Sequence, residues 1–336
     1  MSRPLNVLIV GCGYWGKNYV RIFNELEDAN VLALCDKDPD KLAAVSERFA
    51  GSQTYTELSE ALQEPELDAV VVCTVAKTHF DVVSQCLEAG KHVLVEKPMT
   101  TTVADGETLQ RLAKNNKVTL MVGHTFMYNA SVEKLKTLLD APQFGQLHYL
   151  HSSRTHLGLI RQDVNALWDL APHDVSIFNY LVGSEPLWVS AVASKLLGER
   201  EDVGFINLGY ENGVIANIHA TWANPNKVRE LVAVGSKQRI SFDDANKEAP
   251  VQVLERGVER LANGELNIRE GEASLPSVAA SEPLKAQSQH FVHAVQTGTA
   301  PRTDAAEGLA VVRVMVAADE SIAKNGQPVS LAPVLA

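Results

Sequence analysis

Residues 7–16 read Val-Leu-Ile-Val-Gly-Cys-Gly-Tyr-Trp-Gly, an apolar run that leads into the pattern GxGxxG. In a strand-turn-helix unit, Gly11 permits the tight turn, Gly13 lets backbone approach a pyrophosphate, and Gly16 lets the helix pack closely on the sheet. The unpaired N–H groups at the start of such a helix favour an anion. The stretch therefore predicts a dinucleotide site. Its predicted cofactor contacts are Gly11, Gly13, Tyr14, Trp15 and Gly16.

A second apolar run, residues 31–35, ends at Asp36, where an acidic side chain can hydrogen-bond a ribose 2′-hydroxyl and repel a 2′-phosphate. Asp36 thus favours NAD over NADP. Lys37, the next residue, is a cation that leaves NADP open as the alternative.

The composition agrees with an enzyme of two domains. The chain has 336 residues, 46% of them apolar, and a formal net charge of −11. A strongly acidic chain is a poor ligand for a phosphate backbone, so we expect no nucleic-acid partner. No signal-peptide pattern opens the sequence and no apolar run approaches the ~20 residues of a membrane span. We expect no membrane partner and a cytoplasmic location.

Cysteine and histidine spacing gives no sign of a metal site. The four cysteines show no CxxC pair and read as small buried side chains: Cys12, Cys35, Cys73 and Cys86. The ten histidines form no HxH or HxxxH pair beside carboxylates. We predict that the protein holds no metal.

Short apolar runs alternate with helical stretches through residues 1–125. Strands are predicted at 6–10, 31–35, 69–73, 92–95 and 118–122, and helices near 16–27, 39–50, 56–63, 78–89 and 103–115. This alternation is typical of right-handed βαβ units, and it predicts a doubly wound parallel sheet of the Rossmann type. Residues 1–125 are therefore expected to form the NAD-binding domain.

Ligands of such sheets bind beyond the carboxyl ends of the strands. The run at 69–73 is followed by Thr74 and His79, and the run at 92–95 by Glu96 and Lys97. We predict that these four residues join Asp36 in the cofactor site. The alternative for Glu96 and Lys97 is a solvated charge pair at a strand end.

From residue 126 the pattern changes to α+β and predicts a substrate-binding and oligomerisation domain over 126–336. We predict a helix near 130–140, a strand near 146–154, a helix near 169–181 and then several antiparallel strands, with the strands forming a large open sheet. Residues 245–282 are predicted to be irregular. A last helix near 305–323 is expected to pack on either domain. The strand near Val214–Trp222 is apolar on one face and only half polar on the other. The second face predicts a homodimer or homotetramer formed through this sheet; helix cover from the same chain is the alternative.

Three residues fit the oxidation of a secondary alcohol, which we expect where the two domains face each other. Asp169 and His173 are four apart, on one side of a predicted helix, and Lys97 lies at a strand end before Pro98. His suits the role of base near neutral pH, a cation stabilises a developing alkoxide, and an Asp can orient the imidazole or contact a neighbouring hydroxyl. The alternatives are structural: Asp169 as a helix N-cap and His173 as a packing residue.

The glycine-rich turn, Glu96-Lys97-Pro98 and Asp169-xxx-His173, in this order, resemble the glucose-fructose oxidoreductase and inositol dehydrogenase family, Gfo/Idh/MocA. The resemblance spans nearly the whole chain. It implies a Rossmann domain, a second domain on an open sheet, NAD(P), and a polyol or sugar substrate. It also implies catalytic roles for Lys97 and His173, substrate positioning by Asp169, and a cis peptide before Pro98.

The stretches 154–174 and 222–236 resemble the branch of this family that acts in sugar-nucleotide and surface-polysaccharide biosynthesis. That branch includes UDP-N-acetylglucosamine and UDP-N-acetylglucosaminuronate 3-dehydrogenases. The resemblance implies a UDP-sugar substrate oxidised at its C3 hydroxyl, and basic side chains in this region could reach its diphosphate. The predicted substrate contacts are Arg154, His156, Arg161, Asn165, Lys227 and Arg229. Salt bridges for the basic residues, and capping or loop closure by Asn165 and His156, are the alternatives.

Two other functions stay open at this point. A dehydrogenase or reductase of free inositol or an unactivated sugar would need no phosphate-binding cations. A sensor without catalysis would bind NAD and a sugar, but it has no need of the pair Lys97 and His173.

Overall fold

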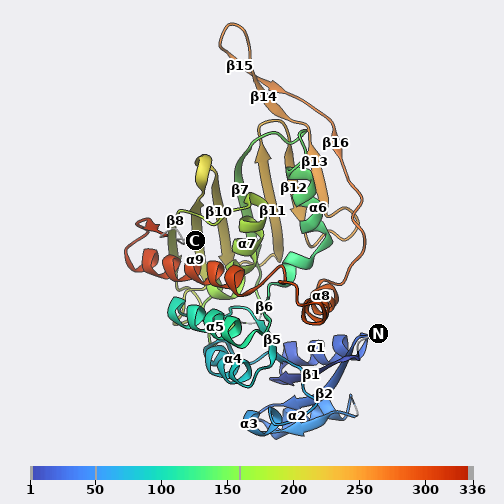
Figure 1. Ribbon diagram of the computed structural model, residues 1–336. Helices are drawn as coiled ribbons and strands as arrows, with labels where there is room; N and C mark the ends of the chain where they lie inside the picture. The colour runs from blue at the N-terminus through green and yellow to red at the C-terminus, as the bar shows by residue number, and fades with distance from the viewer. Residues whose placement is uncertain (1–2, 50, 159, 332–336) are drawn as a thin grey trace. The chain divides into compact units, whose positions relative to one another are not determined.

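The computed structural model describes residues 3–49, 51–158 and 160–331 (Figure 1). The chain divides into two compact units. The first runs up to Tyr128 and takes in Glu282–Val312, and the second contains Asn129–Ser281 and the chain from Arg313 onward. Each unit combines a sheet with helices, so the predicted α/β class is confirmed.

A six-stranded parallel sheet forms the centre of the first unit, in the order β3-β2-β1-β4-β5-β6. Its strands are β1 (Leu5–Val10), β2 (Ala29–Cys35), β3 (Gln53–Tyr55), β4 (Ala69–Val72), β5 (His92–Glu96) and β6 (Leu120–Gly123). The central strands are almost entirely buried and rich in Val, Ile and Leu, as expected of a parallel sheet covered on both faces. The edge strand β3 was not predicted, because three polar residues carry no apolar pattern.

The first unit also contains helices and short 3-10 turns. The helices are α1 (Tyr14–Asn24), α2 (Pro39–Ser46), α3 (Leu58–Ala61), α4 (His79–Glu88), α5 (Val103–Asn116) and α8 (Pro283–Thr297), with the 3-10 turns η1 (Ala76–Thr78) and η2 (Thr125–Tyr128). α8 comes from the far end of the sequence and packs against α1. The last helix, α9 (Ala305–Ala323), begins in the first unit and ends in the second.

The second unit is built on a nine-stranded sheet in the order β16-β13-β12-β11-β7-β10-β9-β8-β17. Its strands are β7 (Leu147–Thr155), β8 (Trp188–Ser194), β9 (Val203–Gly209), β10 (Ile215–Thr221), β11 (Val228–Gly235), β12 (Arg239–Asp243), β13 (Val251–Leu254), β16 (Ala273–Ser274) and β17 (Val329–Ser330). β7 and β10 run parallel, and the other pairs are antiparallel. The predicted large, mainly antiparallel sheet is confirmed.

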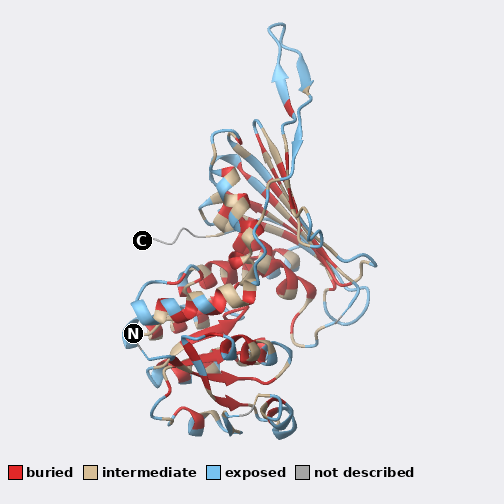
Figure 2. Cartoon of the chain, turned by 90° about the vertical axis from the view of Figure 1, so that its right-hand side faces the viewer, coloured by how far each residue is buried: buried red, intermediate tan, exposed pale blue. Residues whose placement is uncertain are grey.

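The two faces of this sheet differ. α6 (Ala130–Leu139) and α7 (Ala166–Val182) cover one face of the sheet, whereas these helices do not cover the opposite face (Figure 2). Along β10 the residues facing the helices are buried, but Ile215 on the opposite face is 50% exposed. Phe205 on β9 and Tyr149 on β7 share that face and are 42% and 45% exposed. We call this second surface the open face. The alternative prediction, that helices of the same chain cover this face, does not hold at Tyr149, Phe205 and Ile215, which are exposed.

Two predictions for the second unit are wrong. α7 begins at Ala166 rather than near 169, because the Asn165 side chain caps it by accepting a hydrogen bond from the Trp168 N–H group at 2.9 Å. The stretch 245–282 is not irregular: besides β13 and β16 it contains β14 (Gly257–Arg260) and β15 (Leu266–Arg269), which pair with each other. Their many charged residues obscured the alternation that short strands need.

Two further findings concern turns and helices. Gly183 ends α7 with a φ of 82°, the left-handed conformation that favours glycine at a helix C-cap. The 3-10 turn η3 (Glu211–Gly213) precedes β10. No helix among the described residues is long and apolar enough to cross a membrane.

Candidate active site

The turn between β1 and α1 has room for a phosphate group. Gly11 has a φ of 94°, and a Cβ atom there would lie 2.8 Å from the Cys73 carbonyl. A Cβ atom on Gly16 would lie 1.9 Å from the Gly11 carbonyl oxygen, whereas one on Gly13 would meet nothing within 4 Å. No side chain caps the start of α1. Glycine is thus required for packing at two positions and leaves open space at the third, where backbone N–H groups can bind an anion.

Asp36 lies beside this turn at the end of β2. One carboxylate oxygen accepts a hydrogen bond from the Cys12 N–H group at 2.7 Å, and the other accepts from the Asp38 N–H group at 3.0 Å. Tyr14 and Trp15, on the first turn of α1, are 76% and 42% exposed and contact each other edge to face. These residues, predicted to bind the cofactor, come together on one edge of the sheet.

His79 links the loops that follow β4 and β5. Its imidazole is buried, with Nδ1 2.7 Å from the Pro98 carbonyl oxygen and Nε2 3.0 Å from that of Thr74. The Lys97–Pro98 peptide is cis, as the resemblance implies. The ring therefore joins the two strand ends predicted to contribute to the cofactor site.

Glu96 and Lys97 are both buried, so the interpretation as a solvated charge pair is wrong. One Glu96 carboxylate oxygen accepts a hydrogen bond from the Tyr19 hydroxyl at 2.8 Å, and the other accepts from the Lys97 N–H group at 3.2 Å. Gln287 on α8 donates to the Tyr19 hydroxyl at 2.7 Å. This network ties the end of β5 to α1 and α8 and fixes the backbone that carries Lys97.

His124, which directly follows β6, was missed by the sequence analysis. It is 1% exposed, and its Nε2 lies 3.6 Å from the Glu307 carboxylate on α9. In the part of the chain that the structure describes, neither ring nitrogen has a hydrogen-bond partner. Burial, helped by the positive charge of Lys97, lowers the pKa of His124 to about 3. The signal was available, since His124 ends a parallel strand as Asp36 and Thr74 do.

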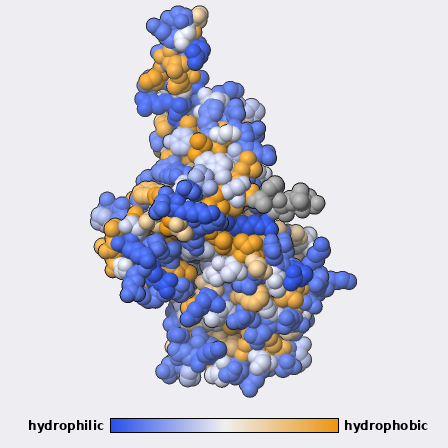
Figure 3. Space-filling model, turned by 90° about the vertical axis from the view of Figure 1, so that its left-hand side faces the viewer, coloured by the Kyte–Doolittle hydropathy of each residue, from blue (hydrophilic) through white to orange (hydrophobic). Residues whose placement is uncertain are grey.

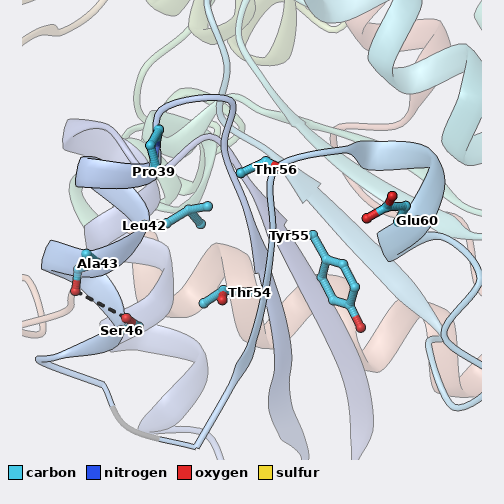
Figure 4. Close-up of a pocket in the computed structure, with 8 residues that line it drawn as sticks. All are labelled: Pro39, Leu42, Ala43, Ser46, Thr54, Tyr55, Thr56 and Glu60. Carbon is cyan, nitrogen blue, oxygen red and sulfur yellow. Dashed lines mark hydrogen bonds between the residues drawn. The ribbon is translucent and has the colours of Figure 1, made fainter.

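A surface pocket of about 380 Å³ lies elsewhere in the first unit (Figure 4). It is lined by Pro39, Leu42, Ala43, Ser46, Thr54, Tyr55, Thr56 and Glu60. None of the predicted site residues lines it, so we do not place the reaction there.

In the second unit, α7 carries Asp169 and His173 one turn apart, so both lie on one side of the helix. One Asp169 carboxylate oxygen accepts a hydrogen bond from Arg161 at 3.1 Å, and the other accepts from the Trp222 indole N–H at 3.3 Å. Asp169 is therefore held in place from two segments, and it is not the cap of α7.

Four of the predicted substrate contacts have structural partners: Arg154, Asn165, Arg229 and Arg161, which donates to both oxygens of the Asp163 carboxylate at 2.9 and 2.5 Å as well as to Asp169. Arg154 is buried on β7 and donates two hydrogen bonds, at 2.9 and 3.0 Å, to the Asp174 carboxylate on α7. Asn165 caps α7 and also donates to Glu201 at 3.2 Å. Arg154 thus neutralises a buried carboxylate. A bidentate pair of this kind is costly to break, because either charge alone would be left buried without a partner.

Charged residues from two segments act on His156. Burial lowers its pKa, the positive charges of Arg229 and Lys227 act in the same direction, and the negative charge of Asp169 opposes them. Arg229 also pairs with Asp244 at 3.3 Å. Lys227 is exposed, and no described carboxylate forms an ion pair with it. Asp169, Lys227 and Arg229 are thus each close enough to act on His156.

No group of three or more His, Cys, Asp and Glu side chains within the described ranges could hold a metal ion. The first unit gathers the predicted cofactor residues at its strand ends, and the second gathers Asp169, Arg161, His156, Lys227 and Arg229. The roles of all these residues remain predictions.

Two family models match this chain. Residues 5–124 match an oxidoreductase family with an NAD-binding Rossmann fold, and residues 132–241 match the GFO/IDH/MocA C-terminal domain. Together they cover more than half of the chain.

Curated relatives carry different substrate names. Myo-inositol 2-dehydrogenase of Thermotoga maritima is 27% identical over 265 residues, which cover 75% of this chain and 79% of the relative. UDP-N-acetylglucosamine 3-dehydrogenase of Acidithiobacillus ferrooxidans is 24% identical over 311 residues, which cover 92% and 94%. Among solved structures, GenD2 from gentamicin A biosynthesis, in complex with NAD, has a TM-score of 0.85 at 23% identity and covers 99% of this chain and 98% of its own; this likeness shows the fold.

The glycine contacts predict opposite outcomes for two matched variants. Gly16→Ala forces its methyl group against the Gly11 carbonyl and should cost about 1–3 kcal/mol of unfolding free energy. Gly13→Ala should keep the wild-type stability and only weaken NAD binding, because its methyl group occupies the phosphate space. Thermal unfolding and NAD titration measure both. Equal stability of the two variants would contradict the assigned contacts.

The buried His124 predicts an acid-sensitive fold. The folded protein keeps this imidazole neutral, whereas the unfolded chain takes up a proton near its ordinary pKa of 6.5. Its contribution to stability is therefore fully present above pH 6.5 and is lost as the pH falls toward 3, by on the order of a few kcal/mol. Lys97 and Glu307 are the charged groups beside it.

Urea unfolding at pH 7 and pH 4.5 tests this contribution. His124→Gln should lose less stability than the wild type between the two pH values, and His293→Gln, at an exposed position on α8, should behave as the wild type. The same pH dependence in all three proteins would rule out the titration of His124.

Proposed function

The chain belongs to the Gfo/Idh/MocA family of oxidoreductases with an NAD-binding Rossmann fold, and from this premise we propose that it oxidises the C3 hydroxyl of a UDP-sugar. The substrate we favour is UDP-N-acetylglucosamine or its uronate, and the product is the 3-keto sugar. Such a product would serve the synthesis of amino sugars for a surface polysaccharide or lipid A. The use of NAD fits a cytoplasmic location.

The observation that carries this proposal is the group of charges around His156. Lys227 and Arg229 act on its pKa, and so does Asp169, four residues before the proposed base. A diphosphate needs cations near the site where the sugar is held, and a free polyol does not. Lys227 has no competing carboxylate among the described residues, so its charge is available to a phosphate.

In the reaction we propose, His173 takes the proton of the sugar hydroxyl as the general base. Lys97 stabilises the negative charge that develops on that oxygen, and Asp169 orients the substrate. NAD⁺, when bound, supplies the acceptor for the hydride that leaves the same carbon. The carbon is thereby oxidised to a ketone, and the proton and the hydride leave by separate routes.

Arg154 and Asn165 take positioning roles in this proposal. Arg154 neutralises Asp174, the residue that follows His173, and so fixes the helix that carries the base. Asn165 fixes the start of that helix. Arg161 acts through Asp169, which it contacts at 3.1 Å.

The relative that acts on myo-inositol supports a second function, the oxidation of free inositol or of an unactivated sugar. This alternative uses the same base and the same cofactor. It differs in that a substrate without phosphate groups does not need phosphate-binding cations.

The proposed assembly is a homodimer or homotetramer formed through the open face. Tyr149, Phe205 and Ile215 leave apolar surface exposed on this face. Exposed apolar groups of this size on a sheet are typical of surfaces that meet a partner.

The reduction of NAD⁺ by purified protein tests the proposed reaction. We expect NADH formation with UDP-N-acetylglucosamine or UDP-N-acetylglucosaminuronate, and not with myo-inositol. Lys97→Ala and His173→Ala should each lower kcat by about 10²–10⁴-fold, the usual contribution of an acid-base group. Activity with myo-inositol alone would contradict the UDP-sugar proposal and keep the catalytic residues.

Two lysine variants, one at the proposed site and one away from it, test the contact with the diphosphate. Lys227→Ala should raise KM for the UDP-sugar by about tenfold, the effect of one lost charge-assisted hydrogen bond, without changing NAD affinity. Lys324→Ala, at another exposed lysine of the same unit, should leave both unchanged. Free UDP should compete with the substrate; a failure to compete, together with a normal KM in Lys227→Ala, would remove the diphosphate from the proposal.

A further inference from the structure

β14 and β15 form a two-stranded arm in the second unit. Among the described strands they pair only with each other, and they extend the hairpin that β13 and β16 begin (Figure 1). At the base of the arm the Glu255 N–H group donates to the Glu272 carbonyl oxygen at 3.0 Å. An isolated two-stranded hairpin is only marginally stable in water, so a partner surface would stabilise this arm.

The arm has one apolar and one polar face. Val258 pairs with Ile268 and Arg260 with Leu266, so these four side chains share one face. On that face Val258, Leu266 and Ile268 are 52%, 65% and 68% exposed. The opposite face carries the pair Glu259 and Asn267. Figure 3 shows hydrophobic residues gathered in a patch on the arm.

The open face of the large sheet is a second exposed apolar surface in the same unit. Val192 and Phe205 are directly opposite each other on β8 and β9, and they are 50% and 42% exposed. Ile215 and Tyr149 form a similar pair on β10 and β7, at 50% and 45%. A monomer would leave both this face and the arm in water.

Charges on the two surfaces are complementary. Glu230 and Asp243 are directly opposite each other on β11 and β12, and register places them on the open face with Val232. Like charges in this position are destabilising. Neither carboxylate has an ion pair with a described residue, and the same holds for Arg260 on the apolar face of the arm. A cation from another copy of the chain would relieve the repulsion between Glu230 and Asp243.

We propose that the arm of one copy lies on the open face of a second copy, with Arg260 beside Glu230 and Asp243. Leu266 and Ile268 then pack against apolar residues of that face. Two copies related by a twofold axis make this contact twice, so the interface closes on itself. The inference rests on the proposed assembly through the open face and specifies which segment completes it.

Sedimentation velocity of the full-length protein tests the arm. The double variant Leu266→Asp/Ile268→Asp should weaken assembly by at least about tenfold in the dissociation constant, since it buries unpaired carboxylates. Asn267→Asp, on the polar face of the same arm, should assemble as the wild type. Far-UV circular dichroism and NAD binding should be unchanged in both, because the arm lies outside the buried core.

Charge reversal tests the register of the contact. Arg260→Glu should weaken assembly, and the combination Arg260→Glu/Glu230→Arg should restore it. Mixing an Arg260→Cys protein with a Glu230→Cys protein under oxidation should give a disulfide-linked dimer, whereas neither protein alone should form that heterologous link.

The outcomes separate this inference from the assembly it rests on. A wild-type protein that stays monomeric at all concentrations would overturn both. An oligomer that persists in Leu266→Asp/Ile268→Asp, with no cross-link in the mixture, would overturn the arm contact and leave assembly through the open face standing. Neither result bears on NAD⁺ reduction, which is measured separately.

Discussion

The close approach of the Gly11 carbonyl to Gly16 determines the geometry of the turn between β1 and α1. It brings α1 against the end of β1, so that backbone N–H groups at the helix start lie at the edge where the parallel strands end. The Asp36 carboxylate fixes the same turn by accepting from the Cys12 N–H group. The turn and Asp36, the residue predicted to discriminate between NAD and NADP, are therefore parts of one hydrogen-bonded unit.

Buried polar contacts position the catalytic candidates in both units. Glu96, which precedes Lys97, accepts a hydrogen bond from Tyr19. Arg154 forms an ion pair with Asp174, the residue after His173. A buried charge is tolerated only when its partner is close and well aligned, so these pairs fix the backbone around them. In the proposed reaction, positioning and chemistry are thus divided between neighbouring residues of the sequence.

The sequence predicted those features of the fold and of the candidate site that depend on residues close together in the chain. The turn, the parallel strands and the pair Asp169 and His173 follow from spacing within short segments. The partners of Arg154 and Asn165 could not be predicted, because Asp174 and Glu201 are brought to them only by the folded chain. The arm at 257–269 was missed for another reason: its charged residues obscured the alternation of two strands that are only four residues long.

A calorimetric titration of NAD⁺ and NADP⁺ tests the central claim most directly. The account predicts that the wild-type protein binds NAD⁺ more tightly, because the Asp36 carboxylate accepts from a ribose hydroxyl and repels a 2′-phosphate. Asp36→Asn, which keeps an acceptor oxygen and removes the charge, should narrow the difference. Binding of NADP⁺ as tight as that of NAD⁺ by the wild type would contradict the role given to Asp36 and to the turn it holds.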